Sequence, residues 1–272
     1  MKYYYRNLLI KYNNTINTIV LIINNKQLEK YVEAIKGDTI LGIDTEFRRI
    51  DSYFPELCLI QIASKYQLEC IDVLSISNLQ PLFDKLYDGK TLWVIHSARQ
   101  DIEALYYLSD RIPSLLFDTQ IGASFLNYPL QVSYQSLTEK LQNILLDKQY
   151  TRFDWRIRPL PNDVLQYALD DVKYLLPNYN NLTKELKNKG KLDWAEEEVE
   201  LLLNKDTFKP NFRMILKKTK GISKISHQNQ ENAFRLILWR ESTAQQKNKP
   251  RRWIMSDEAL IAYADGTRKL SN

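Results

Sequence analysis

Short β-branched apolar runs alternate with segments of helical periodicity from residue 16 to about residue 204. Along this stretch apolar residues recur either every two residues, as in a strand, or about every 3.6 residues, as in a helix. The first three predicted strands follow one another with short connections, and later strands alternate with helices. This order predicts an α/β fold in which helices flank both faces of a mixed β-sheet. From about residue 205 onward only helical patterns occur.

These patterns predict individual elements and three regions. Strands are expected at residues 18–23, 39–44, 57–63, 67–73 and 91–95. Helices are expected at residues 26–36, 78–87, 98–108, 118–126, 133–143, 162–188, 193–204, 210–218, 226–245 and 256–264. Pro177 is expected to end or kink the helix at 162–188, because proline lacks a backbone N–H. We expect an N-terminal extension (1–15), an α/β domain (16–205) and a small helical domain (206–272).

Charge divides the 272-residue chain into an acidic body and a basic tail. Residues 204–272 carry 15 Lys or Arg and 6 Asp or Glu, a net charge of +9, whereas residues 1–203 have a net charge of −4. An acidic body is typical of metal binding and a basic tail of phosphate binding. A well-solvated basic surface is the simpler alternative for the tail.

Composition excludes several classes of protein. With 44% apolar residues, the chain is neither disordered nor collagen-like. Two cysteines, Cys58 and Cys70, and two histidines are too few for a disulfide scaffold or a structural zinc site. The longest apolar run, Ile19 to Ile23, is too short to cross a membrane. We therefore expect a cytoplasmic protein that does not associate with membranes.

Asp44 and Glu46 lie two residues apart at the end of an apolar strand. Alternation along a strand directs both side chains to one face, and Ile43, Thr45 and Phe47 to the other. Two adjacent like charges repel each other unless a cation lies between them. A cation site is one interpretation of this pair, and a solvated strand end is the other.

Asp101 lies where the strand at 91–95 leads into the next helix. Ser97 and Gln100 match the capping box that begins a helix, which places Asp101 in the first helical turn. The helix dipole favours negative charge there, so we expect an ionised carboxylate that suits a metal ligand. An ordinary first-turn acid is the alternative.

Tyr167 and Asp171 are four residues apart in the helix predicted from Asn162 onward, so they lie one above the other on a single face. Asp170 is rotated by about 100° from Asp171 and is expected to face solvent. Taken alone, the pair fits a packed tyrosine beside a surface acid. After the two preceding motifs, it completes an ordered set of acidic residues.

The order of these motifs resembles the DEDD superfamily of 3′→5′ exonucleases, in its tyrosine-bearing subclass. The local sequence is similar to the ribonuclease D family over roughly residues 18–270, in segments 44–47, 59–62, 96–103, 147–155, 158–160 and 167–175. The resemblance implies a ribonuclease H-like mixed sheet flanked by helices, followed by a small all-α domain of the HRDC type. It also implies hydrolysis of RNA from the 3′ end to nucleoside 5′-monophosphates, in tRNA 3′-end processing.

The resemblance assigns the site to Asp44, Glu46, Asp101, Tyr167 and Asp171. It implies two divalent cations, Mg²⁺ or Mn²⁺, which carboxylate oxygens suit. Asp44 would bridge the two ions, and Glu46 and Asp171 would complete the first. Asp101 would hold the second, partly through water. Tyr167 would orient the attacking water, because a phenol with a pKa near 10 is a poor base at neutral pH.

Other residues near these motifs have less specific expectations. His96 is expected to be a structural partner, because the histidine of the other subclass would stand at the position of Gln166. Phe153 stands where the family more often has a small hydroxyl residue and is expected to alter local packing. Three basic residues are either phosphate contacts or ordinary surface charges: Arg152, Arg156 and Arg158.

Residues 208–264 resemble the helical HRDC module that follows the nuclease in ribonuclease D and also occurs in RecQ-type helicases. Its basic side chains would contact phosphates without regard to sequence: Lys217, Lys218, Lys220, Lys247, Lys249, Arg251 and Arg252. Trp253 is expected in the core, with stacking on a base as the alternative. Members of the family usually carry a second module, so substrate grip and processivity stay open.

Three functions are consistent with the sequence. We predict a metal-dependent exoribonuclease that acts as a monomer on tRNA precursors or other structured RNA 3′ ends. A DNA exonuclease of the same superfamily is the second, because recognition of the 2′-hydroxyl depends on pocket shape. A catalytically inactive RNA-binding scaffold is the third, and the presence of all four carboxylates and Tyr167 disfavours it.

Overall fold

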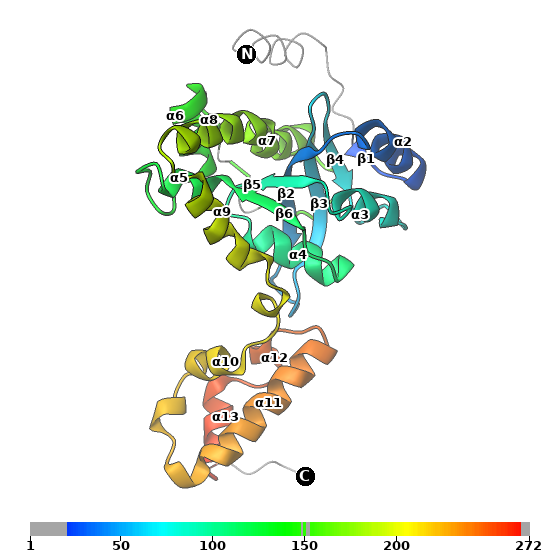
Figure 1. Cartoon of the computed structure of the whole chain (residues 1–272). Coiled ribbons are helices and arrows are strands. Elements are labelled where there is room, and N and C mark those ends of the chain that lie inside the picture. The colour runs from blue at the N-terminus through cyan, green and yellow to red at the C-terminus, as the bar shows by residue number, and fades with distance from the viewer. Residues whose placement is uncertain (1–20, 148, 151–152, 268–272) are drawn as a thin grey trace. The chain divides into compact units, whose positions relative to one another are not determined.

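The computed structural model describes residues 21–147, 149–150 and 153–267. They contain a six-stranded sheet in the order β1-β4-β3-β2-β5-β6 (Figure 1). The strands are β1 (Leu21–Ile22), β2 (Ile40–Arg48), β3 (Glu56–Ala63), β4 (Leu68–Asp72), β5 (Leu92–Ile95) and β6 (Leu115–Asp118). β3 runs antiparallel to β4, whereas β1 with β4, β2 with β5 and β5 with β6 pair in parallel. The predicted mixed sheet is confirmed, and the predicted extension at 1–15 lies outside the described residues.

Helices cover both faces of this sheet. They are α2 (Asn25–Ile35), α3 (Gln80–Leu86), α4 (Arg99–Ser109), α5 (Thr119–Ser124), α6 (Tyr134–Gln142), α7 (Asn162–Lys173), α8 (Leu175–Asn188) and α9 (Leu192–Glu200). α7 and α8 pack on one face of the central strands, and α4 packs against β2 from the other face (Figure 1). The α/β architecture predicted from the changing period is therefore confirmed.

Burial on both faces explains why the central strands are almost continuously apolar. β3 is buried from Leu57 to Ala63. Ile43 of β2 and Trp93 of β5 are fully buried, and the indole N–H of Trp93 donates to the carbonyl of Leu86 at 2.8 Å. The acidic side chains of β2 therefore project from a sheet whose central strands are buried.

Strand β6 is missing from the predicted strands, because the period of a short apolar run such as Leu115–Phe117 does not distinguish a strand from a buried helix segment. It lies parallel to β5 at the edge of the sheet. The helix expected at 118–126 is correspondingly shorter, spanning Thr119–Ser124. Asp118 belongs to the strand, and its carboxylate caps the helix by accepting backbone N–H groups of the first turn.

The predicted capping box at Ser97 is wrong. Ser97 has a φ of 61°, and Ala98 precedes α4 without a side-chain capping bond. The carboxylate of Asp118 instead accepts the backbone N–H of Ser97 at 3.0 Å and of Ala98 at 2.8 Å. A side chain from β6 thus satisfies donors that a local motif was expected to serve. Asp101 still lies in the first turn of α4.

The helix expected at 162–188 is divided into α7 and α8 at Tyr174. Pro177 lies in the first turn of α8. In a continuous helix its ring would clash with the carbonyl of Lys173, which is the residue where α7 ends. The predicted break before Pro177 is therefore confirmed.

The chain divides into two compact units. One comprises the residues up to Arg48 together with Leu57–Thr207, and the other comprises Arg49–Glu56 together with the residues from Phe208 onward. The helices of this C-terminal unit are α10 (Phe212–Lys218), α11 (Gln230–Gln246), α12 (Arg251–Ile254) and α13 (Asp257–Ala264). α12 is not predicted, and the helix expected at 226–245 begins later, after a 3₁₀ turn at His227–Asn229.

The core of the C-terminal unit is small and apolar, with Ile215, Ile237 and Leu260 at its centre. The loop 49–55, which connects β2 to β3, joins this unit through Tyr53. Its hydroxyl donates to Glu241, and its backbone N–H donates to the side chain of Asn248 at 3.0 Å. Among the described residues, no helix is both long and apolar enough to cross a membrane.

Candidate active site

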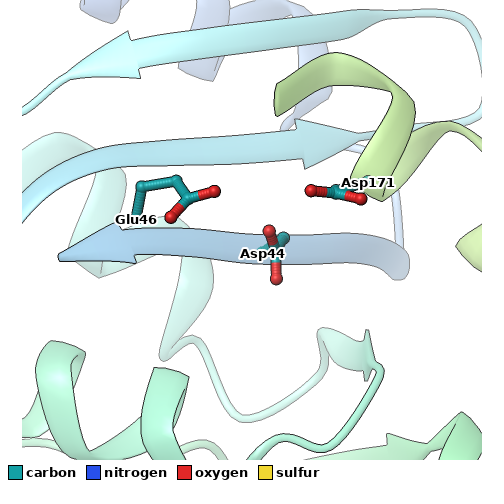
Figure 2. Close-up of side chains that lie close together, drawn as sticks. All are labelled: Asp44, Glu46 and Asp171. Atoms are coloured by element: carbon teal, nitrogen blue, oxygen red, sulfur yellow. The ribbon is translucent and has the colours of Figure 1, made fainter. Parts of the chain in front are cut away.

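Asp44 and Glu46 project from the same face of β2, as strand alternation predicts. In the described part of the chain, they form a group with Asp171 in which one carboxylate oxygen of each residue lies within 4.8 Å of the others. Figure 2 shows Glu46 and Asp171 directed toward each other, with Asp44 between them. All three side chains are half-buried.

Asp171 reaches this strand because α7 lies close to the sheet. The buried residues of α7 include Val164, Ala168 and Val172. At the start of α8, a Cβ atom on Gly42 would lie only 3.1 Å from the Cβ of Leu175, so the missing side chain of Gly42 permits the close approach of helix and strand. The face of α7 that carries Asp171 therefore lies against the face of β2 that carries Asp44 and Glu46.

Tyr167 stands one turn before Asp171 and is 9% exposed. Its ring packs against Tyr150 and Trp155, with ring centroids 5.8 Å and 6.5 Å away. Its hydroxyl is hydrogen-bonded to the carboxylate of Asp171. The tyrosine is thus fixed by packing and placed at the edge of the acidic group.

Asp101 approaches the same region from α4 on the other side of β2. Its Oδ1 atom accepts hydrogen bonds from the backbone N–H of Thr45 at 3.1 Å and from the hydroxyl of Thr45 at 2.6 Å. Asp101 is buried and is not one of the three residues within 4.8 Å of one another. Its charge nevertheless raises the pKa values of Asp44 and Glu46.

Burial and like charge oppose ionisation throughout the acidic group. Burial, followed by the neighbouring carboxylates, raises the pKa of Asp44 and of Glu46 well above their usual values. Burial also raises the pKa of Asp171 to about 7, although the hydrogen bond from Tyr167 acts in the other direction. For Asp101 burial raises the pKa to about 7, and this outweighs the bonds from Thr45. Burial thus opposes the ionisation that the helix dipole was expected to favour at Asp101.

The donor set fits divalent cations with hard, oxygen-preferring chemistry. Asp44, Glu46 and Asp171 offer only carboxylate oxygens, which suit Mg²⁺ or Mn²⁺ rather than zinc. Cations placed among them would remove the repulsion that raises the pKa values of these groups. The sequence correctly placed these three residues together.

His96 is held by the fold, in agreement with its expected structural role. Its Nε2 lies 2.9 Å from the carbonyl of Val132, and its Nδ1 lies 2.9 Å from the hydroxyl of Thr119. Burial lowers the pKa of His96, which favours the neutral ring. Asp170, which was expected to face solvent, is half-buried and lies 3.8 Å from Lys173.

The basic residues near 152–158 do not share one role. Arg158 is half-buried and forms a two-point ion pair with Asp72, with both N–O distances at 2.7 Å, so it is not a free surface charge. Arg156 lies 3.5 Å from Asp154. Arg152 lies outside the described residues. Phe153 packs edge-to-face on Trp155 at 5.3 Å, which agrees with its expected role in local packing.

Two supporting residues have no place in the predicted site. Thr45 donates two hydrogen bonds to Asp101. Strand alternation could have indicated this contact, because it directs Thr45 to the face opposite Asp44. Asp118 orders the turn before α4 from a strand 20 residues later in the chain. No local sequence pattern predicts this contact between Asp118 and the turn before α4.

Comparisons with known proteins agree with this geometry. The family model for the 3′–5′ exonuclease matches residues 19–187. Ribonuclease D of Bartonella henselae is 39% identical over 246 residues, covering 90% of this chain and 60% of the relative. Ribonuclease D of Gluconacetobacter diazotrophicus is 35% identical, covering 90% of this chain and 62% of the relative. The chain thus spans about three fifths of the length of these curated relatives.

The fold is similar to that of a solved ribonuclease D. The crystal structure of Escherichia coli ribonuclease D matches with a TM-score of 0.86 and 27% identity, over 93% of this chain and 67% of that one. The resemblance to ribonuclease D expected from the motifs is confirmed by these similarities. The family model covers the residues that carry the acidic group, and the chain belongs to the 3′–5′ exonuclease family.

Proposed function

We propose that this protein is a metal-dependent 3′→5′ exoribonuclease that releases nucleoside 5′-monophosphates from the 3′ ends of structured RNA, including tRNA precursors. The observation that carries the proposal is the clustering of Asp44, Glu46 and Asp171 in a chain of the exonuclease family. The similar Escherichia coli protein is described as an exoribonuclease involved in structured RNA processing, which supports RNA as the substrate.

The acidic side chains would hold two divalent cations. Asp44, Glu46 and Asp171 would ligate the first. Asp44 and Asp101 would hold the second, with Oδ2 of Asp101 available because Thr45 bonds to Oδ1. When bound, the two cations stabilise negative charge on the attacking and leaving oxygens of an in-line displacement.

Tyr167 would orient the attacking water by hydrogen bonding. Burial, followed by the charges of Asp171 and Glu46, raises the pKa of Tyr167 above its usual value, so its hydroxyl keeps its proton at neutral pH. A protonated phenol is a donor and not a general base. Water attacks the terminal phosphate, the bond from phosphorus to the preceding 3′ oxygen breaks, and that oxygen takes a proton.

The C-terminal unit would bind the RNA backbone as an HRDC-like module. It contains a cavity of about 610 Å³ whose lining includes Lys218, Arg251 and Arg252. Trp253 also lines the cavity and is 63% exposed, so the core position expected for it is wrong. An exposed indole beside cations favours the alternative of stacking on a base.

We further propose that the protein is a cytoplasmic monomer. Its two buried cysteines, Cys58 and Cys70, are free thiols, which fits a reducing compartment.

A time course with 5′-labelled single-stranded RNA and matched DNA, in Mg²⁺, Mn²⁺ or EDTA, tests the proposal. We expect a metal-dependent ladder that shortens from the 3′ end of the RNA. Equal or faster loss of the DNA would instead identify a DNA exonuclease. Binding of RNA by folded protein without any cleavage would identify an inactive scaffold.

A further inference from the structure

Gln61 of β3 is fully buried, yet its amide is unsatisfied. Within the described part of the chain, neither Oε1 nor Nε2 of Gln61 has a hydrogen-bond partner. Burying a primary amide without hydrogen bonds opposes folding, and an apolar side chain of similar size would avoid this cost. Packing of the sheet does not account for such a buried polar group, so a functional reason for it is needed.

The register of the sheet places Gln61 beside Asp44. Figure 2 shows the neighbouring strand, β3, running opposite to the strand that carries Asp44. A Cβ on Gly42 would lie 3.3 Å from the Cβ of Ala63, so these two residues are cross-strand neighbours on one face. Because the two strands run in opposite directions, the residue two positions after Gly42 lies opposite the residue two positions before Ala63. Asp44 therefore lies opposite Gln61, and both side chains are on that same face.

The strand on the other side of β3 supports this placement. Gln61 is paired in register with Cys70 of β4. Burial chiefly, and then the charges of Glu69, Asp44 and Glu46, raise the pKa of Cys70. Cys70, Gln61 and Asp44 therefore form one row across the sheet, which lies beneath α7.

We propose that Gln61 is a positioning residue for Asp44, whose Nε2 donates a hydrogen bond to the Asp44 carboxylate when that carboxylate ligates a cation. Carboxylates that ligate metals are commonly oriented by a hydrogen bond from a second side chain. Gln61 offers two N–H donors, carries no charge and lies on the correct face. The inference rests on the proposed metal site and gives a role to Gln61, which lies in the matching segment 59–62 but is not among the predicted site residues.

The variant Gln61→Met tests this role with two readouts that do not depend on cleavage. The thermal midpoint of the protein in EDTA should stay the same or rise, because an unsatisfied buried amide is replaced by an apolar chain of similar size. The affinity for Mn²⁺ without RNA, measured by isothermal titration calorimetry, should fall by about 10- to 100-fold. A structural role alone would lower the midpoint and leave the Mn²⁺ affinity as in wild type.

Gln67→Met is the matched control, because Oε1 of Gln67 is also buried without a hydrogen bond and Gln67 precedes β4 in the same hairpin. Its Mn²⁺ affinity should equal that of wild type. Equal Mn²⁺ affinity of wild type and Gln61→Met would overturn the role of Gln61 and leave the proposed function standing. A wild-type protein with no measurable Mn²⁺ affinity would overturn the proposed function together with this role.

Discussion

Both the α/β unit and the C-terminal unit pair buried charges, as Arg158 with Asp72 and Arg240 with Asp257, but the α/β unit also gathers carboxylates that raise one another's pKa values. Arg240 is 2% exposed and donates to Asp257 at 2.8 Å, while Glu241 lies 3.2 Å from Arg251. In the α/β unit, by contrast, burial and then the surrounding carboxylates raise the pKa of Asp44. A paired buried charge belongs to the structure, whereas unpaired like charges mark a place for cations from solution.

Removing a carboxylate from the acidic group tests whether the α/β unit binds cations, and it should have the largest effect, on the cleavage rate. Asp44→Asn or Asp171→Asn should lower the cleavage rate by at least about 10³-fold, because several kcal/mol of charge stabilisation depend on the bound cations. The stability in EDTA should not fall, since a repulsive charge is lost. Single-turnover assays and thermal melts measure both effects.

Asp170→Asn is the matched control for that experiment, because Asp170 adjoins Asp171 on α7 but pairs with Lys173. Its cleavage rate should stay within a few-fold of wild type. A wild-type rate for Asp44→Asn would contradict the metal assignment.

Breaking the ion pair of the C-terminal unit should give the opposite pattern. Arg240→Met leaves Asp257 buried without its partner, which should cost about 3–5 kcal/mol of unfolding free energy for that unit. Urea denaturation measures the loss. The double variant Arg240→Met/Asp257→Leu should recover much of it, because no buried charge is then left alone. Mn²⁺ affinity should not change in either variant, and a loss of affinity would show that the two charged regions are not independent.

Tyr167→Phe separates water orientation from metal binding. The turnover rate should fall by about 10²-fold, because the hydroxyl that positions the attacking water is removed. Mn²⁺ affinity should match wild type, since the phenol is not among the proposed ligands. Steady-state kinetics with a short RNA give the rate, and an unchanged rate would remove Tyr167 from the active site.

Local patterns placed each pair of side chains on one face, the resemblance to a family joined the pairs into one site, and local patterns failed where distant segments meet. Strand alternation placed Asp44 and Glu46 on one face, and helical spacing placed Tyr167 above Asp171. Both depend only on regular backbone geometry. The capping of α4 by Asp118 was missed, because a nearby Ser offered a local motif and the true acceptor lies on another strand. Arg158 was misjudged for a similar reason, since Asp72 lies 86 residues away.

The pH dependence of stability gives a smaller effect. The pKa values of Asp101 and Asp171 are raised to about 7, above the value near 4 expected in the unfolded chain. Through these two groups the folded protein in EDTA holds more protons than the unfolded chain, so their contribution to stability is largest below about pH 4 and is lost as the pH rises through 7. We expect the midpoint to drop by roughly 5 °C between pH 5 and pH 8.

Mg²⁺ should offset this drop and stabilise more at pH 8 than at pH 5, because protons compete with the cation. Thermal melts across this range, with Mg²⁺ or EDTA, make the comparison. A midpoint in EDTA that rises with pH would contradict the assigned direction of these pKa shifts.

The smallest expected effect concerns the exposed cations of the C-terminal unit. Arg252 is 68% exposed and only 4.0 Å from Asp257, a weak pair that a phosphate contact would replace at little structural cost. Arg252→Gln should weaken RNA binding a few-fold and reduce the salt dependence of binding by about one phosphate contact. Fluorescence anisotropy at several salt concentrations measures the slope. An unchanged slope would exclude Arg252 from the RNA interface.

The central claim is that the unpaired carboxylates of the α/β unit bind two cations. Anomalous diffraction at the manganese edge, from crystals soaked in MnCl₂ and a nucleoside 5′-monophosphate, tests it most directly. We predict two peaks about 3.5–4 Å apart, both beside Asp44, with one reaching Glu46 and Asp171 and the other reaching Asp101. Well-ordered crystals with no peak at Asp44 would contradict the account.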